Sequence, residues 1–395
     1  AIANGNTYTD AGGATDSLSG EMSNGQNAGI LAVSGYETVS LTPNGGGDTV
    51  IVDVRNVTGM TTLDLNTAHA NDDFTVNNIK TGTTIEISGA AATNTAAVRT
   101  TVGDSATSQS FSNTVASTIT SLVLDAGTTT LNFASGDSDG TAAETFTTLS
   151  GITGAALATI NVTGDDDLIL PTLATTTVTM DGTGSTGDIT VTASTTATAL
   201  KGGTGADALT GGSAADTITG GAGIDTIIGA AGADRIVFEA TGSGTGSNGL
   251  DVITFVTGAA ADILDFSAFL TAGTVFQNGA AGNAITPVVH TATADVDITN
   301  KVVLLHNGAA AGHNTAVEIA GEIDGAANAL SITAGGKGVI IEGDNAGGTI
   351  ATAYYVHDVN GDGDVGDANE VMPIMTGVGN LDLDTTLTSN IDVVA

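Results

Sequence analysis

The feature that most constrains this chain is a run of four consecutive nine-residue units at residues 202–237. The units read GGTGADALT, GGSAADTIT, GGAGIDTII and GAAGADRIV. Each carries an aspartate at its sixth position and a branched aliphatic residue at its eighth. Self-similarity at a short fixed period is typical of coils in which each unit packs on its neighbours. The run therefore predicts a parallel β-roll.

The residue types of each unit indicate how such a roll binds metal. Glycines permit the turn and expose peptide carbonyls, and the segment around the eighth position forms a strand with its aliphatic side chain inward. Two units complete one coil, so stacked turns pair Asp207 with Asp225 and Asp216 with Asp234. A hard divalent cation prefers several oxygen ligands, which carboxylates and glycine carbonyls supply. We expect Ca²⁺, bound at several sites.

The expected ligands of the roll are the turn glycines and aspartates. They are Gly203, Gly205, Asp207, Gly212, Asp216, Gly221, Gly223, Asp225, Gly232 and Asp234. Asp251, in GSNGLDVIT, is a candidate for a displaced fifth turn. Ala214 and Ala230 replace glycines of the pattern, and alanine tolerates positive φ poorly, so we expect weaker or distorted sites at those turns. The alternative is a Gly/Asp-rich loop that binds nothing.

At these residues the chain resembles the calcium-binding RTX (repeat-in-toxin) proteins, which bacteria export by type I secretion. The resemblance covers about a tenth of the chain and implies folding outside the cell on calcium. SGYETVSL at 34–41 resembles a phrase of RTX-type S-layer proteins, and 251–270 resembles the segment that closes the open end of the roll. The final residues, LDLDTTLTSNIDVVA, resemble an uncleaved type I secretion signal; the alternative is an ordinary terminal strand.

Outside the repeats, short strands alternate apolar with Thr, Asp or Asn residues, as in Val39/Leu41, Leu63/Leu65 and Ile85/Ile87. Such alternation predicts strands with one buried face, and their near-constant spacing predicts a parallel β-solenoid. We therefore expect an all-β chain. Its solenoid or β-helix (1–200, rich in Thr, Ala and Gly) continues into the calcium β-roll (201–254), and a small, mainly β C-terminal cap carries the secretion signal (255–395).

A second candidate calcium site lies in DVNGDGDVGDANE. Asp358, Asn360, Asp362 and Asp364 have the spacing of the first half of an EF-hand loop, with Gly363 at the sixth position. The twelfth position is Asn369 instead of glutamate. A plain Asx-rich hairpin turn is the equally weighted alternative.

The composition limits the possible partners. The chain has 43 acidic and 7 basic residues and a net charge of −36, so it repels nucleic acid and anionic lipid. A halophile's solvated surface would also explain this acidity. There is no cysteine, which excludes disulfides and thiolate metal sites. We found no apolar run long enough for a membrane span and no N-terminal signal peptide. The chain does not begin with methionine, so a preceding region that binds cell-surface polysaccharide is expected.

The sequence offers no convincing catalytic cluster. The GxSxG pattern at 136–140 lies among threonine-rich strands, and the five histidines are scattered. No HExxH motif occurs. A β-helical polysaccharide lyase or epimerase would need clustered basic or tyrosine side chains to grip a polyuronate. We therefore expect a protein that is not an enzyme.

The leading hypothesis is a secreted structural protein that assembles with itself into a two-dimensional S-layer lattice on the bacterial surface. Calcium would drive its folding outside the cell and its assembly, after export by the type I apparatus. The first alternative is an RTX adhesin that binds a host surface, a glycan or ice, presenting hydroxyl groups on threonine-bearing strands. The second is the polysaccharide lyase or epimerase.

Overall fold

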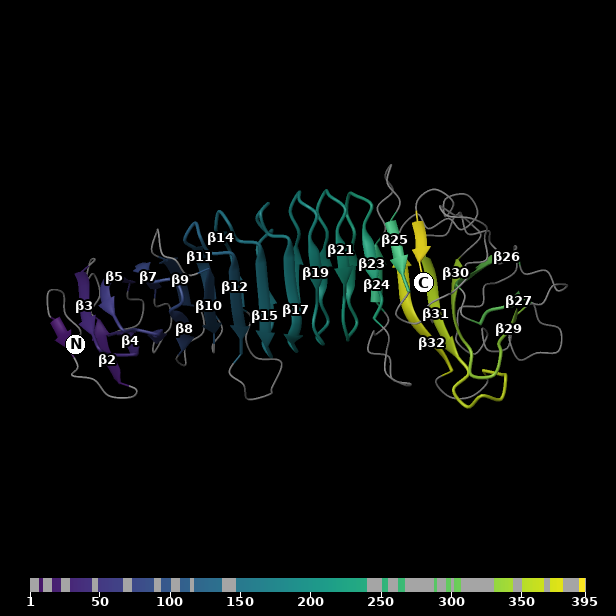
Figure 1. The fold of residues 1–395 in the computed structure, drawn as a ribbon, viewed down its shortest axis with the longest axis horizontal. Coiled ribbons are helices and arrows are strands. Elements are labelled where there is room, and N and C mark those ends of the chain that lie inside the picture. The colour runs from purple at the N-terminus through teal and green to yellow at the C-terminus, as the bar shows by residue number, and fades with distance from the viewer. Residues whose placement is uncertain are drawn as a thin grey trace. The chain divides into compact units, whose positions relative to one another are not determined.

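The computed structural model contains strands as its regular elements throughout the part of the chain that it describes (Figure 1). The described residues are 7–9, 16–22, 29–44, 49–66, 73–88, 94–100, 107–113, 117–136, 147–239, 251–254, 262–266, 288–289, 296–299, 302–306, 330–343, 350–365, 370–378 and 391–394. None of them forms a helix that could span a membrane. The expected all-β class is confirmed. The chain divides into two compact units, Ala1–Thr196 and Ala197–Ala395.

Unit 1 is a parallel β-solenoid made of two sheets, and successive strands alternate between them. In one sheet each strand pairs in parallel with the next. Its strands are β2 (Ser17–Met22), β4 (Thr38–Pro43), β6 (Thr62–Asn66), β8 (Thr84–Ser88), β10 (Ser108–Asn113), β12 (Thr130–Ser135), β15 (Thr159–Gly164) and β17 (Thr179–Ser185). We call this the β4 sheet.

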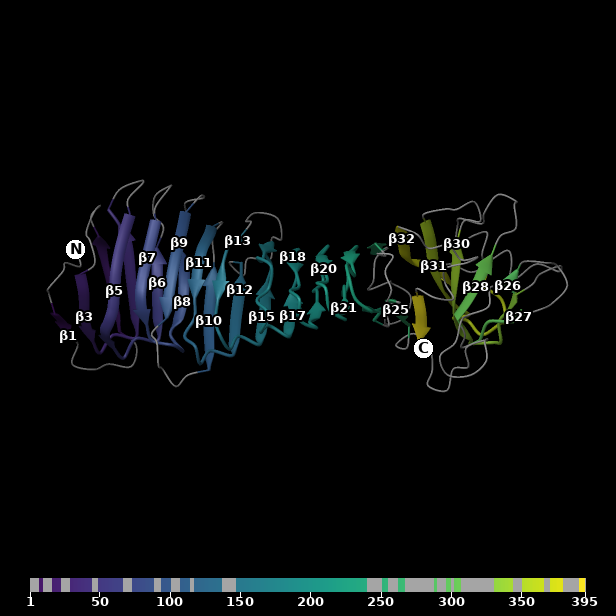
Figure 2. The same cartoon turned by 90° about the horizontal axis from the view of Figure 1, so that it is seen from above.

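The opposite sheet of unit 1 is also parallel. Its strands are β1 (Thr7–Thr9), β3 (Gly29–Ser34), β5 (Thr49–Thr58), β7 (Asp73–Ile79), β9 (Asn94–Thr100), β11 (Ser117–Val123), β13 (Thr147–Leu149), β14 (Ile152–Thr153), β16 (Leu168–Ile169) and β18 (Ile189–Thr192). Figures 1 and 2 show the strands of each sheet lying side by side as successive rungs. The predicted solenoid is therefore confirmed.

The alternating pattern of the sequence decides which side chains fill the solenoid. β4 and β12 alternate half-buried and buried residues along their whole length. The buried residues stack in register as a column that no solvent reaches: Val39, Leu63, Ile85, Phe111 and Phe133. The rings of Phe111 and Phe133 stack with their centroids 5.2 Å apart. Burying each such side chain contributes roughly 1.5–3 kcal/mol, so the column holds neighbouring coils together.

Outward positions of the β4 sheet carry short polar side chains that bond one another. The Ser40 and Ser88 hydroxyls donate to the two carboxylate oxygens of Asp64 at 2.6 and 2.5 Å. Asn132 receives a bond from the Asn161 amide at 2.8 Å. Burial, together with the charge of Asp64, raises the pKa of Glu86, the register partner of Asp64 on β8. Side-chain hydroxyl and amide donors thus bind the acidic and polar side chains on this outer face, in a chain with few basic residues.

Unit 2 begins with short strands in two parallel series. The first series is β19 (Ala199–Lys201), β21 (Thr217–Thr219), β23 (Arg235–Val237), β25 (Asp262–Asp265) and β33 (Ile391–Val394). The second is β20 (Ala208–Thr210), β22 (Thr226–Ile228), β24 (Asp251–Thr254) and β32 (Val371–Val378). Leu209 lies beside Ile227 and Ile218 beside Ile236, which confirms that two nine-residue units complete one coil.

The remaining strands of unit 2 extend the second series. β31 (Ile350–His357) is antiparallel to β32 and to β30 (Lys337–Gly343), and β28 (Val302–His306) and β26 (Val288–Val289) follow in parallel. β27 (Val296–Asp297) pairs with β29 (Leu330–Ser331). Where the structure describes the C-terminal part, its regular elements are strands, as expected.

The segment 251–270, expected to close the open end of the roll, supplies β24 and β25, which form a further coil in register with β22 and β23 and cover the last repeat strands. Asp251, the candidate for a displaced fifth turn, is the first residue of β24. The strands that cover this coil are β32 and β33, from far later in the chain. The terminal segment predicted as a secretion signal thus supplies a strand of the folded sheet, which leaves its role in export untested.

Shortening one inward side chain tests the stacking of unit 1. Leu63→Ala leaves a cavity between the fully buried Val39 and Ile85, so we expect the free energy of unfolding to fall by about 2–5 kcal/mol. Urea denaturation followed by circular dichroism measures this loss. Thr62→Ala on the same strand, a half-buried outward position, is the control and should cost less than about 1 kcal/mol. Equal losses in the two variants would contradict the assignment of inner and outer faces.

Candidate metal centre

The aspartates of the roll are buried in two columns. One column lies at the start of strands β20, β22 and β24 of the second series, and the other at the start of strands β21, β23 and β25 of the first series. Asp207, Asp225 and Asp251 form the first column, and Asp216, Asp234 and Asp262 form the second. All six are at most 3% exposed. In all four pairs of neighbours, Oδ1 accepts the backbone N–H of the aspartate one coil earlier, at distances between 2.8 and 3.1 Å. Each carboxylate therefore joins two coils.

Backbone amides within the same unit bind the second carboxylate oxygen. The N–H of Gly203 donates to Asp207 Oδ2 at 2.7 Å, and that of Gly212 donates to Asp216 Oδ2 at 2.6 Å. Both glycines stand four residues before the aspartate, at the second position of the unit. In these two turns the bond folds the backbone around its own carboxylate.

Carbonyl oxygens from the next coil approach the same place. A methyl group added to Gly202 would lie 2.1 Å from the carbonyl oxygen of Gly220 and 2.2 Å from Asp207 Oδ2. The same addition at Gly221 or Gly223 would meet the carbonyl of Gly203 or Gly205 at 2.2 or 2.0 Å. The turns need glycine because carboxylate and carbonyl oxygens from two coils crowd around them. These are the oxygen ligands that Ca²⁺ prefers.

Asp234 has an oxygen that the protein does not bond. Its Oδ2 is fully buried and has no hydrogen-bond partner among the described residues. The residue four positions earlier is Ala230, which adopts a φ of 68°. A buried charged oxygen without a donor is costly, and a bound cation would relieve that cost. The residues therefore fit a calcium ion by their chemistry.

The pKa values of the roll aspartates indicate that the two columns lack a neighbouring positive charge. Burial raises the pKa of Asp251 to about 8; the bond from the Asp225 amide opposes this rise and the Asp225 charge adds to it. Burial likewise raises the pKa of Asp262 to about 6, against the bond from Asp234 and with its charge. The pKa of Asp234 is raised for the same reasons, with Asp216 as its neighbour. Without a cation these carboxylates are poorly accommodated as anions.

Asp262 is a residue that the sequence analysis missed. It stacks on Asp234, although 28 residues separate the two, and Asp251 stacks on Asp225 across 26 residues. The available signal was the aspartate two residues before an inward aliphatic residue, as in Asp262 and Leu264. Next to this coil, the guanidinium of Arg235 pairs with the buried carboxylate of Asp265, so one acidic group is neutralised within the chain.

Among the described residues, no three His, Cys, Asp or Glu side chains converge on a metal-sized site. The lack of such a cluster agrees with the turn geometry, because each turn adds a single carboxylate and backbone carbonyls would supply most ligands. A search for clustered side chains alone would therefore pass over sites of this type.

The EF-hand-like loop lies in the hairpin between β31 and β32. Asp358 is fully buried, and the N–H groups of Gly335, Gly361 and Gly363 bind its carboxylate at 2.7–2.9 Å. Burial opposes ionisation of Asp358, but these backbone donors prevail and lower its pKa. The carboxylate thus organises the turn, as the hairpin alternative requires.

The other three proposed ligands of this loop are exposed. Asn360 Oδ1 accepts the N–H of Asp362 at 2.9 Å, and Asp362 Oδ1 accepts that of Asp364 at 3.1 Å. Glu370, one position later than the EF-hand pattern places its glutamate, is buried and accepts the Val359 N–H at 3.0 Å. The chain thus brings the residues to one loop, but binds its two buried carboxylates with backbone donors.

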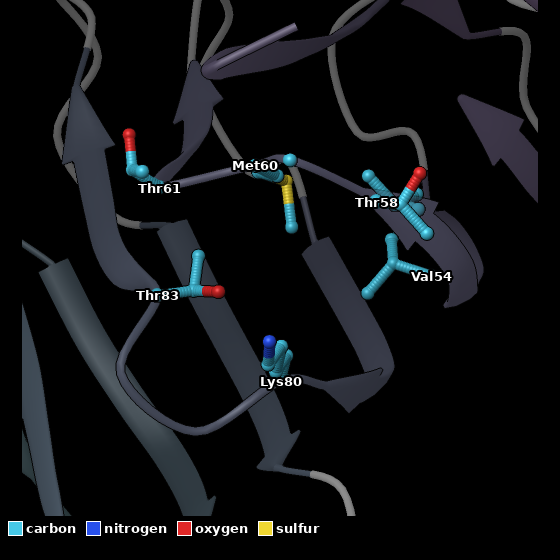
Figure 3. A pocket seen from close by; sticks show the side chains of 8 residues that line it. Val54, Thr58, Met60, Thr61, Lys80 and Thr83 are labelled. Carbon is cyan, nitrogen blue, oxygen red and sulfur yellow. The ribbon is translucent and has the colours of Figure 1, made fainter. Parts of the chain in front are cut away.

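Unit 1 contains a pocket of about 300 Å³ where β5 and β7 separate (Figure 3). The pairing of these strands ends at Asp53 and Asn77, and Asn78 follows with a φ of 61°. The side chains of Arg55 and Asn78 both bind Asp53, and the bond from the Arg55 side chain is the main cause of its lowered pKa.

The lining of this pocket limits its chemistry. It consists of Val54, Val57, Thr58, Gly59, Met60, Thr61, Lys80 and Thr83. Figure 3 shows the side chain of Met60 and the amine of Lys80 directed toward the same space. The lining holds no carboxylate and no imidazole, so it offers no acid–base pair. Of the GxSxG pattern, residues 137–140 lie outside the described residues.

Stacked coils with buried, turn-bound aspartates define a β-roll of the calcium-binding type in unit 2. The family model of the RTX calcium-binding nonapeptide repeat matches residues 200–238 in four copies. The chain therefore carries RTX calcium-binding repeats, as the sequence analysis expected. No curated protein matches the chain. The match covers about a tenth of the chain and describes the roll alone.

The raised pKa values of the roll predict how pH acts on the metal-free protein. A carboxyl group whose pKa is higher folded than unfolded stabilises the fold fully below its unfolded pKa and loses this contribution as pH rises through the folded value. With chelator present, we expect stability of the roll to fall by several kcal/mol between about pH 4 and pH 8, because Asp262 and then Asp251 ionise. Thermal unfolding at a series of pH values measures this. A stability that rises over this range would contradict the burial of these groups.

Proposed function

We propose that this chain is a secreted, calcium-dependent structural protein that assembles into an S-layer lattice on the bacterial surface. The observation that carries the proposal is the pair of buried aspartate columns, whose carboxylates and facing carbonyls form oxygen-rich turns between coils. The protein stacks anions there that its own donors satisfy incompletely. Such a fold depends on an ion from its surroundings.

The residues that would hold Ca²⁺ are the stacked aspartates and the carbonyls of the turn glycines. Asp207 and Asp225 would act together from two coils, with the carbonyl oxygen of Gly220 near Asp207. Asp216 and Asp234 would do the same on the other edge, with the carbonyl oxygen of Gly229 near Asp216. The ion supplies positive charge that offsets carboxylate repulsion. The chain supplies the rest: the amide bonds that orient each carboxylate and the aliphatic column that aligns the turns.

Magnitudes decide whether calcium controls folding. Extracellular calcium modules bind with dissociation constants of about 10⁻⁴ to 10⁻³ M. At about 1 mM free ion each site contributes about 0.4–1.4 kcal/mol. A single site is too weak, but several sites on one roll add up to a large share of a typical domain stability of about 5–15 kcal/mol. At the low calcium of the cytosol the sites contribute almost nothing, which would keep the chain unfolded for type I export.

The proposed partner is a second copy of this chain. An acidic solenoid with few bases repels other copies until cations neutralise its surface, so the same ion would control folding and assembly. The lack of acid–base groups in the unit 1 pocket supports a structural role over a polysaccharide lyase or epimerase. Cell-surface polysaccharide and the export apparatus complete the proposed set of partners.

One observation favours the adhesin as a second candidate. Outward threonines stack in register on the β4 sheet in two columns, Thr38–Thr62–Thr84 and Thr130–Thr159–Thr179. Neighbouring strands of a sheet lie about 4.8 Å apart, so these hydroxyls form a regular array. A flat array of this kind suits a repetitive glycan or ice surface.

Removing the roll carboxylates tests the calcium dependence. Replacing Asp207, Asp216, Asp225 and Asp234 by Ala should abolish the gain of β structure on calcium addition, which circular dichroism measures. The control replaces four carboxylates outside the turns, Glu21, Asp73, Asp181 and Glu239, by their amides and should keep the transition. A wild-type chain that is fully folded in excess chelator would contradict the proposal.

Electron microscopy of the purified chain with calcium tests the lattice. Two-dimensional sheets are expected at about 1 mM Ca²⁺, and their loss on chelation follows from the same neutralisation of charge. Dispersed rods that bind glycan or ice would instead support the adhesin. Turnover of a polyuronate would identify an enzyme.

A further inference from the structure

The two metal-binding edges of the roll differ in sequence because alternate units stack on the same edge. Turns 202–207 and 220–225 form one edge, which we call the complete edge because both turns keep every glycine of the pattern. Turns 211–216 and 229–234 form the other, which we call the alanine edge because it carries Ala214 and Ala230. Both departures from the repeat therefore fall on one side of the roll.

Carboxylate placement differs in the same way. On the complete edge, Oδ2 of Asp207 and Asp225 lies 2.2 and 2.1 Å from the methyl position of the first glycine of its unit. On the alanine edge, the corresponding distances for Asp216 and Asp234 are 3.0 and 2.9 Å. The next-coil carbonyls of Gly220 and Gly229 lie at 2.1 and 2.2 Å from these positions on the two edges. The carboxylates thus lie closer to the first glycine of their turn on the complete edge, while the carbonyls are placed alike on both edges.

Ala230 adds backbone strain to the alanine edge. Its φ of 68° lies in the left-handed region, where a Cβ costs roughly 1–2 kcal/mol. Gly221, at the same unit position on the complete edge, adopts a φ of 106° without a side chain. Ala214 does not share the strain, since its φ is not positive.

We infer that the roll binds calcium in two classes, with the complete edge tight and the alanine edge weak. This inference rests on the proposed calcium-dependent function. Binding is coupled to folding of the turns, so the strain at Ala230 subtracts from the affinity of its edge. A strain of that size corresponds to an affinity difference of about 5- to 30-fold. The complete edge would order the roll at low calcium, and the alanine edge would respond at higher concentrations.

Calorimetric titration of the full chain with CaCl₂ tests the inference, with terbium luminescence as a second readout. Wild-type protein should show two phases. Ala230→Gly should tighten the weak phase by about fivefold or more and leave the tight phase unchanged. Ala231→Gly, at the neighbouring exposed position with no positive φ, is the matched control and should not tighten binding.

Two further variants assign the phases to the edges. Asp225→Asn should remove the tight phase, and Asp234→Asn should remove the weak phase and keep the tight one. A single phase in the wild type, or loss of the tight phase in Asp234→Asn, would overturn the inference while calcium binding itself stands. Absence of any calcium binding would instead overturn the proposed function.

Discussion

Buried carboxylates in successive coils repel one another, and the stability of the roll depends on how this repulsion is offset. Each aspartate of a column accepts the backbone N–H of the one before it, so the hydrogen bonds that align the coils also bring their negative charges together. In a buried site such charges interact far more strongly than in water. Burial is the main cause of the raised pKa values of Asp251 and Asp262, and the charges of Asp225 and Asp234 add to the rise. A cation between the coils is the simplest way to keep both the alignment and the charge.

Other carboxylates of the chain are accommodated without an external ion. Arg55 and Asn78 bind Asp53, and three glycine amides bind Asp358, and the pKa of each carboxyl group is lowered. Arg235 plays the same part for Asp265 beside the last coil of the roll. With seven basic residues in the chain, such pairs cannot be extended to every coil. Because the same acidic turn recurs in successive coils, neutralisation by an external cation in each coil is favoured over neutralisation by an arginine in each coil.

The regular part of the fold was predictable because its signal is local. The nine-residue period fixed which aliphatic side chains point inward and which aspartates stack, and the structure places Leu209 beside Ile227 as that period requires. The strands of unit 1 followed from alternation in the same way. Of the last coil, Asp251 was predicted as a displaced fifth turn and stacks on Asp225. Asp262 escaped prediction because intervening segments lengthen the spacing, although its environment matches that of Asp234.

The closure of the roll was beyond sequence reasoning for a different reason. β24 pairs with β32, and β25 with β33, across more than a hundred residues. The local sequence of these strands does not indicate which strand each will pair with. The structural consequence is that the last coil is completed by the end of the chain. Until residues 391–394 are available, β25 has an open edge on that side, and an open edge leaves backbone groups unpaired. Under the proposed calcium binding, an ion on the turns and strand β33 on the edge would stabilise the same coils in two ways, one electrostatic and one through backbone pairing.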